Sequence, residues 1–158
     1  MLEKPADTTA AKIRIAAMDL LTGREYSRTE LATKLNRRFD SHPSIDEVLA
    51  KITEEGLQSD KRFAEAFVRS RIYRGHGLAR IRQDIRQKGI ADELIAEALE
   101  VADIDWYELA KDVAVRKFGR RSAADQREKA KRMRFMQYRG FNYEQIKYAL
   151  DMVIDTDE

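Results

Sequence analysis

The sequence predicts an all-α protein made of three tandem three-helix repeats, and three observations lead to this fold class. Charged residues make up 37% of the 158 residues and hydrophobic residues 43%, a composition that favours amphipathic helices over disorder. Apolar residues recur at helical spacing, and the alternation typical of strands is absent. Related segments also recur along the chain, as in stacked helical repeats. We therefore expect an elongated, curved, right- or left-handed solenoid-like rod.

Nine helices follow from the periodicity, from capping residues at helix starts and from glycines near helix ends. Their expected ranges are 8–21, 27–38, 44–55, 60–74, 78–88, 91–101, 104–118, 124–139 and 142–153. Apolar pairs that predict the buried faces are, in the same order, Ile13 and Ala17, Leu31 and Leu35, Val48 and Ile52, Phe63 and Phe67, Ile81 and Ile85, Leu94 and Ala98, Leu109 and Val113, Met133 and Met136, and Ile146 and Leu150. Three pairs have the spacing of a capping box: Ser27 with Glu30, Ser44 with Glu47, and Asn142 with Gln145.

The repeat boundaries come from comparing the chain with itself. The segment Gln87–Ile95 aligns with Tyr138–Ile146 at an offset of 51 residues, and Asp46–Leu49 aligns with Asp92–Ile95 at an offset of 46. The predicted parts are a flexible N-terminal tail over residues 1–8 and three-helix repeats over residues 9–57, 58–103 and 104–158.

Composition and motifs exclude several classes of function. The chain has no cysteine and two histidines, His42 and His76, which removes disulfides, zinc–cysteine sites and histidine metal clusters. Phosphate-binding glycine loops and the common catalytic motifs are absent, so we expect no enzyme, no catalytic residue, no metal and no cofactor. Gly75-His76-Gly77 is interpreted as a helix–helix turn with a solvated histidine. Without a signal-peptide pattern or a long apolar run, we expect a cytoplasmic protein with no membrane partner.

Charge is strongly segregated along the chain, although the formal net charge is only +2. Residues 61–88 carry 9 basic and 2 acidic side chains, and residues 111–139 carry 11 and 3. Between them, residues 89–110 carry 7 acidic side chains and no basic one. Ordinary surfaces mix both signs, so two basic blocks predict docking on a polyanion or on an acidic protein groove.

Helical spacing arranges these basic residues in rows. Arg82 and Arg86 are i,i+4 neighbours, and Arg127, Lys131 and Arg134 follow at i, i+4 and i+7. The candidate binding residues are Arg69, Arg71, Arg74, Arg80, Arg82, Arg86, Lys88, Arg116, Lys117, Arg120, Arg121, Arg127, Lys131, Arg132, Arg134 and Arg139. For any one of them the alternative is an ordinary solvated helix face, so the prediction rests on the joint pattern.

Aromatic residues offer a weaker signal. Tyr73, Tyr138 and Tyr143 lie near the basic blocks, and stacking on nucleic-acid bases is one use of such side chains. Packing against the helices is the role we expect for them instead.

Four segments together resemble the RecX family of RecA regulators. They are Gly56-Leu57-Gln58-Ser59-Asp60-Lys61-Arg62-Phe63-Ala64, Arg74-Gly75-His76-Gly77, Lys88-Gly89-Ile90 and Arg139-Gly140-Phe141-Asn142-Tyr143-Glu144-Gln145-Ile146. The match covers about residues 10–153. One departure is that Leu57 and Ser59 stand where the family usually has an aromatic and an acidic residue.

The resemblance implies three tandem three-helix repeats and a non-enzymatic regulator. It implies binding in the groove of the RecA–single-stranded-DNA filament and inhibition of RecA ATPase, strand exchange and coprotease activity, which would modulate DNA repair and the SOS response. The expected partners are thus the RecA filament and single-stranded DNA, with duplex DNA as a further candidate. The protein is expected to be a monomer. The alternative is a helical module that binds DNA directly, independently of RecA; such binding would fall steeply with salt.

Overall fold

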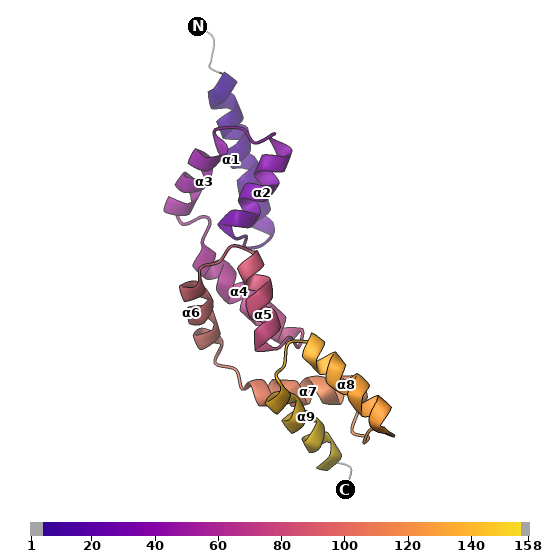
Figure 1. The fold of residues 1–158 in the computed structure, drawn as a ribbon. Coiled ribbons are helices and arrows are strands. Elements are labelled where there is room, and N and C mark those ends of the chain that lie inside the picture. Colours follow the sequence, from indigo (N-terminus) through magenta and orange to yellow (C-terminus); the bar gives the residue numbers. More distant parts are fainter. Residues whose placement is uncertain (1–4, 156–158) are drawn as a thin grey trace. The chain divides into compact units, whose positions relative to one another are not determined.

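The computed structural model describes the backbone of residues 5–155 and the side chains of residues 9–151. In this range the chain forms nine helices and no strand (Figure 1): α1 Pro5–Gly23, α2 Arg28–Arg38, α3 Ile45–Glu54, α4 Asp60–Tyr73, α5 Leu78–Gln87, α6 Asp92–Ala102, α7 Trp106–Phe118, α8 Gln126–Tyr138 and α9 Tyr143–Asp155. The all-α prediction is confirmed, whereas the rod-like stacking of the repeats stays a prediction. Residues 1–4 of the predicted tail lie outside the described residues, and α1 begins at Pro5.

Two of the three predicted capping boxes form. At the start of α2, the Glu30 amide donates to Ser27 Oγ at 3.1 Å, and the Ser27 amide donates to Glu30 Oε1 at 3.1 Å. Before α9, the Gln145 amide donates to Asn142 Oδ1 at 2.9 Å, and the Asn142 amide donates to Gln145 Oε1 at 3.0 Å. These local bonds satisfy backbone donors that the first turn of a helix leaves without partners.

The prediction of a capping box at Ser44 is wrong. The backbone of Ser44 is already helical, with φ −77° and ψ −9°, and its side chain makes no capping hydrogen bond. Its amide instead donates to His42 Nδ1 at 3.0 Å. An N-cap side chain reaches the next turn from an extended backbone, so the turn before α3 removes the geometry that the sequence spacing suggests.

The chain divides into two compact units, and the first consists of Met1–Ala66 with Arg86–Ala98. Its core lies between α1, α2 and α3, and its buried members are Ile13, Ala16, Ala17, Tyr26, Leu31, Leu35, Ile45, Val48, Leu49 and Ile52. On α6, Ile95 is buried at 3% exposure, whereas the predicted Leu94 is half-buried. The apolar stripes therefore point inward, with a shift of one residue on α6.

Gln58 fastens the turn between α3 and α4 in this first unit. Its side chain is 1% exposed and donates to the carbonyl of Tyr26 at 3.2 Å and to Asp60 Oδ1 at 2.9 Å. The same Asp60 oxygen accepts from the amide of Arg28 at 2.9 Å. The segment from Gly56 to Ala64, which carries part of the family resemblance, thus joins two turns that are distant in sequence.

The second unit consists of Phe67–Ile85 with Leu99–Glu158. Its core joins α7, α8 and α9 through Ala110, Val113, Ala114, Met136, Phe141, Ile146 and Ala149. Phe118 of α7 and Phe135 of α8 meet edge to face with ring centroids 5.4 Å apart, a favourable aromatic geometry. This packing fixes α8, which carries most of the predicted basic row.

Candidate functional site

The sixteen predicted basic residues fall on few elements. Fourteen belong to the second unit: Arg69, Arg71 and Arg74 at the end of α4, Arg80 and Arg82 on α5, Arg116, Lys117, Arg120 and Arg121 at and after the end of α7, Arg127, Lys131, Arg132 and Arg134 on α8, and Arg139 after it. Arg86 and Lys88 belong to the first unit.

Within the second unit, the turn before α5 meets the end of α8 (Figure 1). The Gly77 amide donates to the Arg139 carbonyl at 2.7 Å, and the Ala79 amide donates to the Gly140 carbonyl at 3.3 Å. The Arg139 guanidinium donates to the Arg74 carbonyl at 2.7 Å. A Cβ on Gly77 would lie 2.4 Å from the carbonyl carbon of Gly140. One junction therefore joins Arg74–Gly77 to Arg139–Gly140, two segments that are far apart in sequence. The close approach leaves no room for a side chain at Gly77.

His76 lies inside this junction, so the predicted solvated histidine is wrong. The residue is 9% exposed. Burial, followed by the charges of Arg80, Arg71 and Arg139, lowers the pKa of His76 to about 4, against a smaller opposing effect of Asp84. The imidazole is therefore neutral at pH 7, and the positive charge of the junction belongs to its arginines.

Carboxylates neutralise several predicted cations. Asp84 Oδ2 lies 2.6 Å from Arg71 Nη1 and 3.7 Å from Arg80 Nε, and Arg71 is half-buried. Arg86 Nε lies 3.3 Å from Asp92 Oδ1 in an exposed pair, which is worth little in water. Asp84 is one of only two acidic residues in the basic segment 61–88. An acidic residue among so many basic ones is a sequence signal that it pairs with one of them.

Arg132 differs from its neighbours on α8 because it is buried, at 7% exposure. Its guanidinium donates to the Arg121 carbonyl at 2.8 Å and to Glu128 Oε1 at 2.9 Å. It also lies 5.0 Å from the Phe118 ring centroid. These contacts hold the loop between α7 and α8, while Arg132 Nε has no hydrogen-bond partner among the described residues.

Basic residues also gather at the opposite end of α8 from the junction, about 20 Å away for a helix of this length. The four that lie at and after the end of α7 are exposed: Arg116, Lys117, Arg120 and Arg121. None of the four makes an ion pair with another described side chain. The structure thus separates the second basic block into two ends joined by α8.

The predicted row on α8 is exposed along its length. Arg127, Lys131 and Arg134 lie on one face of the helix, and all three are exposed. No ion pair joins them to another side chain in residues 9–151. Arg69, Arg74 and Arg82 are exposed in the same unit. Free cations of this kind are available to phosphate or carboxylate groups.

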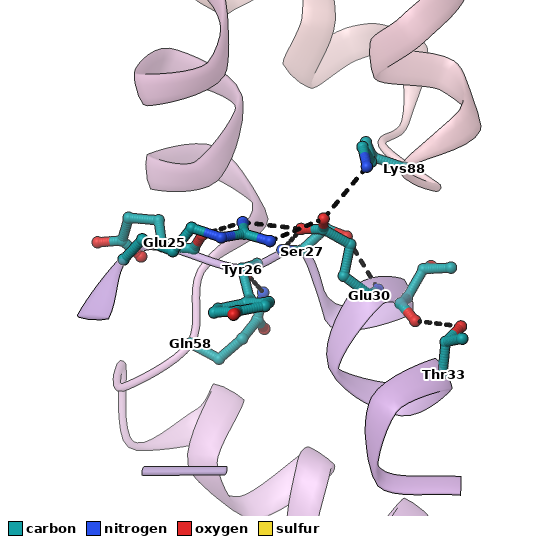
Figure 2. A network of polar contacts seen from close by, with 9 residues as sticks. Glu25, Tyr26, Ser27, Glu30, Thr33, Gln58 and Lys88 are labelled. Carbon is teal, nitrogen blue, oxygen red and sulfur yellow. Dashed lines mark hydrogen bonds and ion pairs between the residues drawn. The ribbon is translucent and has the colours of Figure 1, made fainter. Parts of the chain in front are cut away.

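Lys88 of the first unit has a structural partner, Glu30 (Figure 2). Lys88 Nζ lies 3.3 Å from Glu30 Oε2, and Arg24 Nη2 lies 3.2 Å from the same oxygen. Burial by itself would raise the pKa of Glu30, but hydrogen bonds from Arg24 and Ser27 and the charge of Lys88 lower it below its usual value. Lys88 therefore fastens the turn after α5 to the start of α2.

The expectation that three tyrosines pack against the helices is wrong. Tyr73 is 86% exposed, Tyr138 75% and Tyr143 58%. Tyr138 follows Arg127, Lys131 and Arg134 on the same stripe of α8, at i+11 from the first. That spacing is the sequence signal that could have identified it as a surface residue.

Neither a metal site nor a membrane-spanning helix is found in the part of the chain that the structure describes. No group of three or more histidine, cysteine, aspartate or glutamate side chains among them is arranged to hold a metal ion. In residues 5–155, no helix combines the length and apolar character needed to cross a membrane.

Two stretches of the chain match models of known domains. Residues 59–99 match the second three-helix domain of RecX, and residues 103–150 match the third. Among solved structures, the chain is similar to the crystal structure of RecX from Lactobacillus salivarius, with a TM-score of 0.70, 26% identity, and coverage of 93% of this chain and 95% of that one. A second crystal structure, of a regulatory protein RecX, has the same fold at a TM-score of 0.76 and 24% identity, covering 92% of this chain and 73% of that one.

Similarity to curated relatives extends over nearly the whole chain. The regulatory protein RecX of Halorhodospira halophila is 44% identical over 153 residues, which cover 97% of this chain and 95% of the relative. That of Chromohalobacter salexigens is 43% identical over 143 residues, covering 90% and 93%. Because identity at this level accompanies two matched RecX domains and the RecX fold, the chain belongs to the RecX family of regulatory proteins.

Proposed function

We propose that this protein regulates RecA by binding in the groove of the filament that RecA forms on single-stranded DNA. Bound there, it inhibits RecA ATP hydrolysis, strand exchange and coprotease activity, and it modulates DNA repair and the SOS response. It acts in the cytoplasm as a monomer of three tandem repeats, by occupancy rather than by catalysis, and it needs no cofactor. Membership in a family whose relatives are named regulatory proteins supports this proposal.

The observation that carries the binding mode is the row of exposed cations on the second unit. Arg127, Lys131 and Arg134 make no ion pair with a described carboxylate, and Arg82 of α5 is exposed in the same unit. A filament of protein and DNA presents phosphates and carboxylates, which such arginines and lysines bind through charge-assisted hydrogen bonds. The buried Arg132 and the paired Arg71 and Lys88 serve the fold instead.

The test is RecA ATP hydrolysis on single-stranded DNA, measured while the purified full chain is titrated. We expect inhibition that saturates with protein concentration, together with much weaker binding to the same DNA without RecA. Charge reversal of Lys131 and Arg134 together should weaken inhibition while circular dichroism keeps the helical signal. Absence of inhibition at any concentration, or equal affinity for bare DNA and for the filament, contradicts the proposal; the second result favours a module that acts on DNA independently of RecA.

A further inference from the structure

A groove lies between α1 and α2 in the first unit. Its volume is about 390 Å³, and it is lined by Ala16, Leu20, Lys34, Leu35, Arg37 and Arg38. Pockets for ligands begin at about 300 Å³, so a groove of this size holds a few side chains and not the surface of a whole domain. Its occupant is therefore expected to be a short segment.

The floor of the groove is apolar and fixed. Ala16 is 2% exposed and Leu35 1%, and both belong to the core of the first unit. Leu20 is half-buried and packs against the same core. Because the core holds these side chains in place, a ligand meets a preformed apolar surface, and binding requires little reorganisation. An apolar side chain that enters the groove leaves water, which stabilises the complex.

The rim of the groove is basic. Lys34, Arg37 and Arg38 are exposed, and no carboxylate is among the lining residues. None of the three cations forms an ion pair with another side chain in residues 9–151. Asp19 precedes Leu20 on α1 but does not line the groove. The rim therefore presents positive charge that no carboxylate of the described residues neutralises.

The spacing of these cations produces a repulsion that an acidic ligand would relieve. Lys34 and Arg38 are i,i+4 neighbours on α2, and Arg37 lies at i+3 from Lys34. Like charges at such spacing destabilise a helix. The helix dipole favours Arg37 and Arg38 in the last turn of α2, but it explains neither Lys34 nor the apolar floor. Carboxylates beside the three cations would remove the repulsion.

The combination of floor and rim distinguishes an acidic peptide from a nucleic acid. Phosphates would satisfy the cations of the rim but would leave the apolar floor without a partner. A peptide can carry both kinds of group, with apolar side chains for Leu20 and Leu35 and carboxylates for the cations. Arginine also binds carboxylates through two parallel hydrogen bonds. Charge complementarity and the apolar floor therefore both favour a peptide.

We propose that the groove between α1 and α2 binds an acidic peptide segment of a partner protein. Apolar side chains of the peptide lie on Leu20 and Leu35, and its carboxylates pair with Lys34, Arg37 and Arg38. The groove belongs to the first unit and uses none of the cations of α8, so the inference does not depend on the proposed function.

The experiment measures fluorescence anisotropy of the full chain with four labelled probes. The first is a short peptide of Glu and Asp with Leu and Phe at helical spacing. The second replaces its acidic residues by Gln, the third replaces its apolar residues by Ser, and the fourth is a single-stranded oligonucleotide of equal charge. We expect the first peptide to bind at least about tenfold more tightly than the second and third, because it alone satisfies both rim and floor.

Lys34→Gln combined with Arg38→Gln should weaken binding of the first peptide about 2- to 30-fold, because two exposed ion pairs are lost. Arg28→Gln is the matched control. Arg28 is exposed on the same helix and forms no ion pair with a described side chain, and it does not line the groove. Circular dichroism should show the same helical signal for wild type and both variants.

A diazirine analogue in place of one Leu of the peptide supplies a second readout, and its crosslink should map to residues 16–20 or 34–38. The proposal is overturned if wild type binds the three peptides equally or not at all, if the double variant binds the first peptide as Arg28→Gln does, or if the crosslink maps elsewhere. If the double variant loses affinity for the oligonucleotide but not for the peptide, the cations bind phosphate and the inference is wrong.

Discussion

The amide of Gly77 donates to the carbonyl of Arg139 at 2.7 Å, and this bond brings together two turns that belong to different predicted repeats. The contact leaves no room for a side chain, because a Cβ on Gly77 would lie 2.5 Å from the carbonyl oxygen of Gly140. The same contact buries His76 and places Arg80 beside Tyr138. The geometry of this junction therefore depends on a glycine.

Gly77→Ala should destabilise the protein by about 1–3 kcal/mol, as overpacking against backbone does. The neighbouring atoms are main chain and cannot move aside as a flexible side chain would. Urea denaturation followed by circular dichroism measures the change. Gly23→Ala is the control, because its Cβ meets nothing within 4 Å and alanine is the better helix former; equal loss in both variants would show that the junction is not the cause.

Ser27→Ala should lower the free energy of unfolding by about 0.5–2 kcal/mol, the usual effect of removing an N-cap. The Ser27 side chain accepts from the Glu30 amide, whereas Ser44 makes no side-chain cap bond. Ser44→Ala should therefore change stability by less than about 0.5 kcal/mol. Thermal unfolding of the two variants checks the difference, and a larger loss for Ser44→Ala would contradict the capping geometry described above.

His76 should make stability depend on pH. Its pKa is lowered from 6.5 to about 4 in the folded protein, so well above pH 6.5 the imidazole is neutral in both states and adds no pH dependence. As pH falls from 6.5 towards 4, the unfolded chain takes up the proton first, and stability falls. Urea denaturation across this range should show a shallower decline for His76→Gln than for wild type. Parallel curves for the two proteins would exclude a buried, neutral histidine.

Lys131→Glu should weaken inhibition of RecA several-fold more than Lys129→Glu does. Both lysines are exposed on α8 and the charge change is identical, but Lys129 lies on the opposite face from the stripe of Arg127 and Arg134. ATP hydrolysis by RecA on single-stranded DNA provides the measurement. Equal effects would mean that overall charge, and not the stripe, determines binding.

The same pair of variants tests direct DNA contact through salt. Each phosphate contact to a single strand contributes about −0.7 to the slope of log affinity against log salt concentration. Lys131→Glu should therefore bind bare single-stranded DNA with a shallower salt dependence than wild type, and Lys129→Glu should keep the wild-type slope. A wild-type slope for both variants would show that Lys131 contacts no phosphate of the single strand.

The helices, their apolar faces and two of the three predicted caps could be predicted from the sequence, because these features depend on residues three or four positions apart. Ser27 with Glu30 and Asn142 with Gln145 needed no distant partner. The family resemblance was also readable from the chain, since its motifs are short and contiguous. The prediction of a cap at Ser44 is wrong because residue spacing does not reveal the backbone conformation of the turn before α3.

Which cations are paired with carboxylates, and which are not, follows from the packing of the helices and could not be predicted from the sequence. Lys88 forms an ion pair with Glu30, and Arg71 forms one with Asp84. The partners lie on different helices or turns, so helical spacing does not predict these pairs. Helical spacing places Tyr138 on the exposed stripe of α8, but its contact with Arg80 depends on the packing of the turn before α5 against the end of α8. The physical reason is that helix formation follows from neighbouring residues, whereas charge pairing and burial follow from how the helices pack.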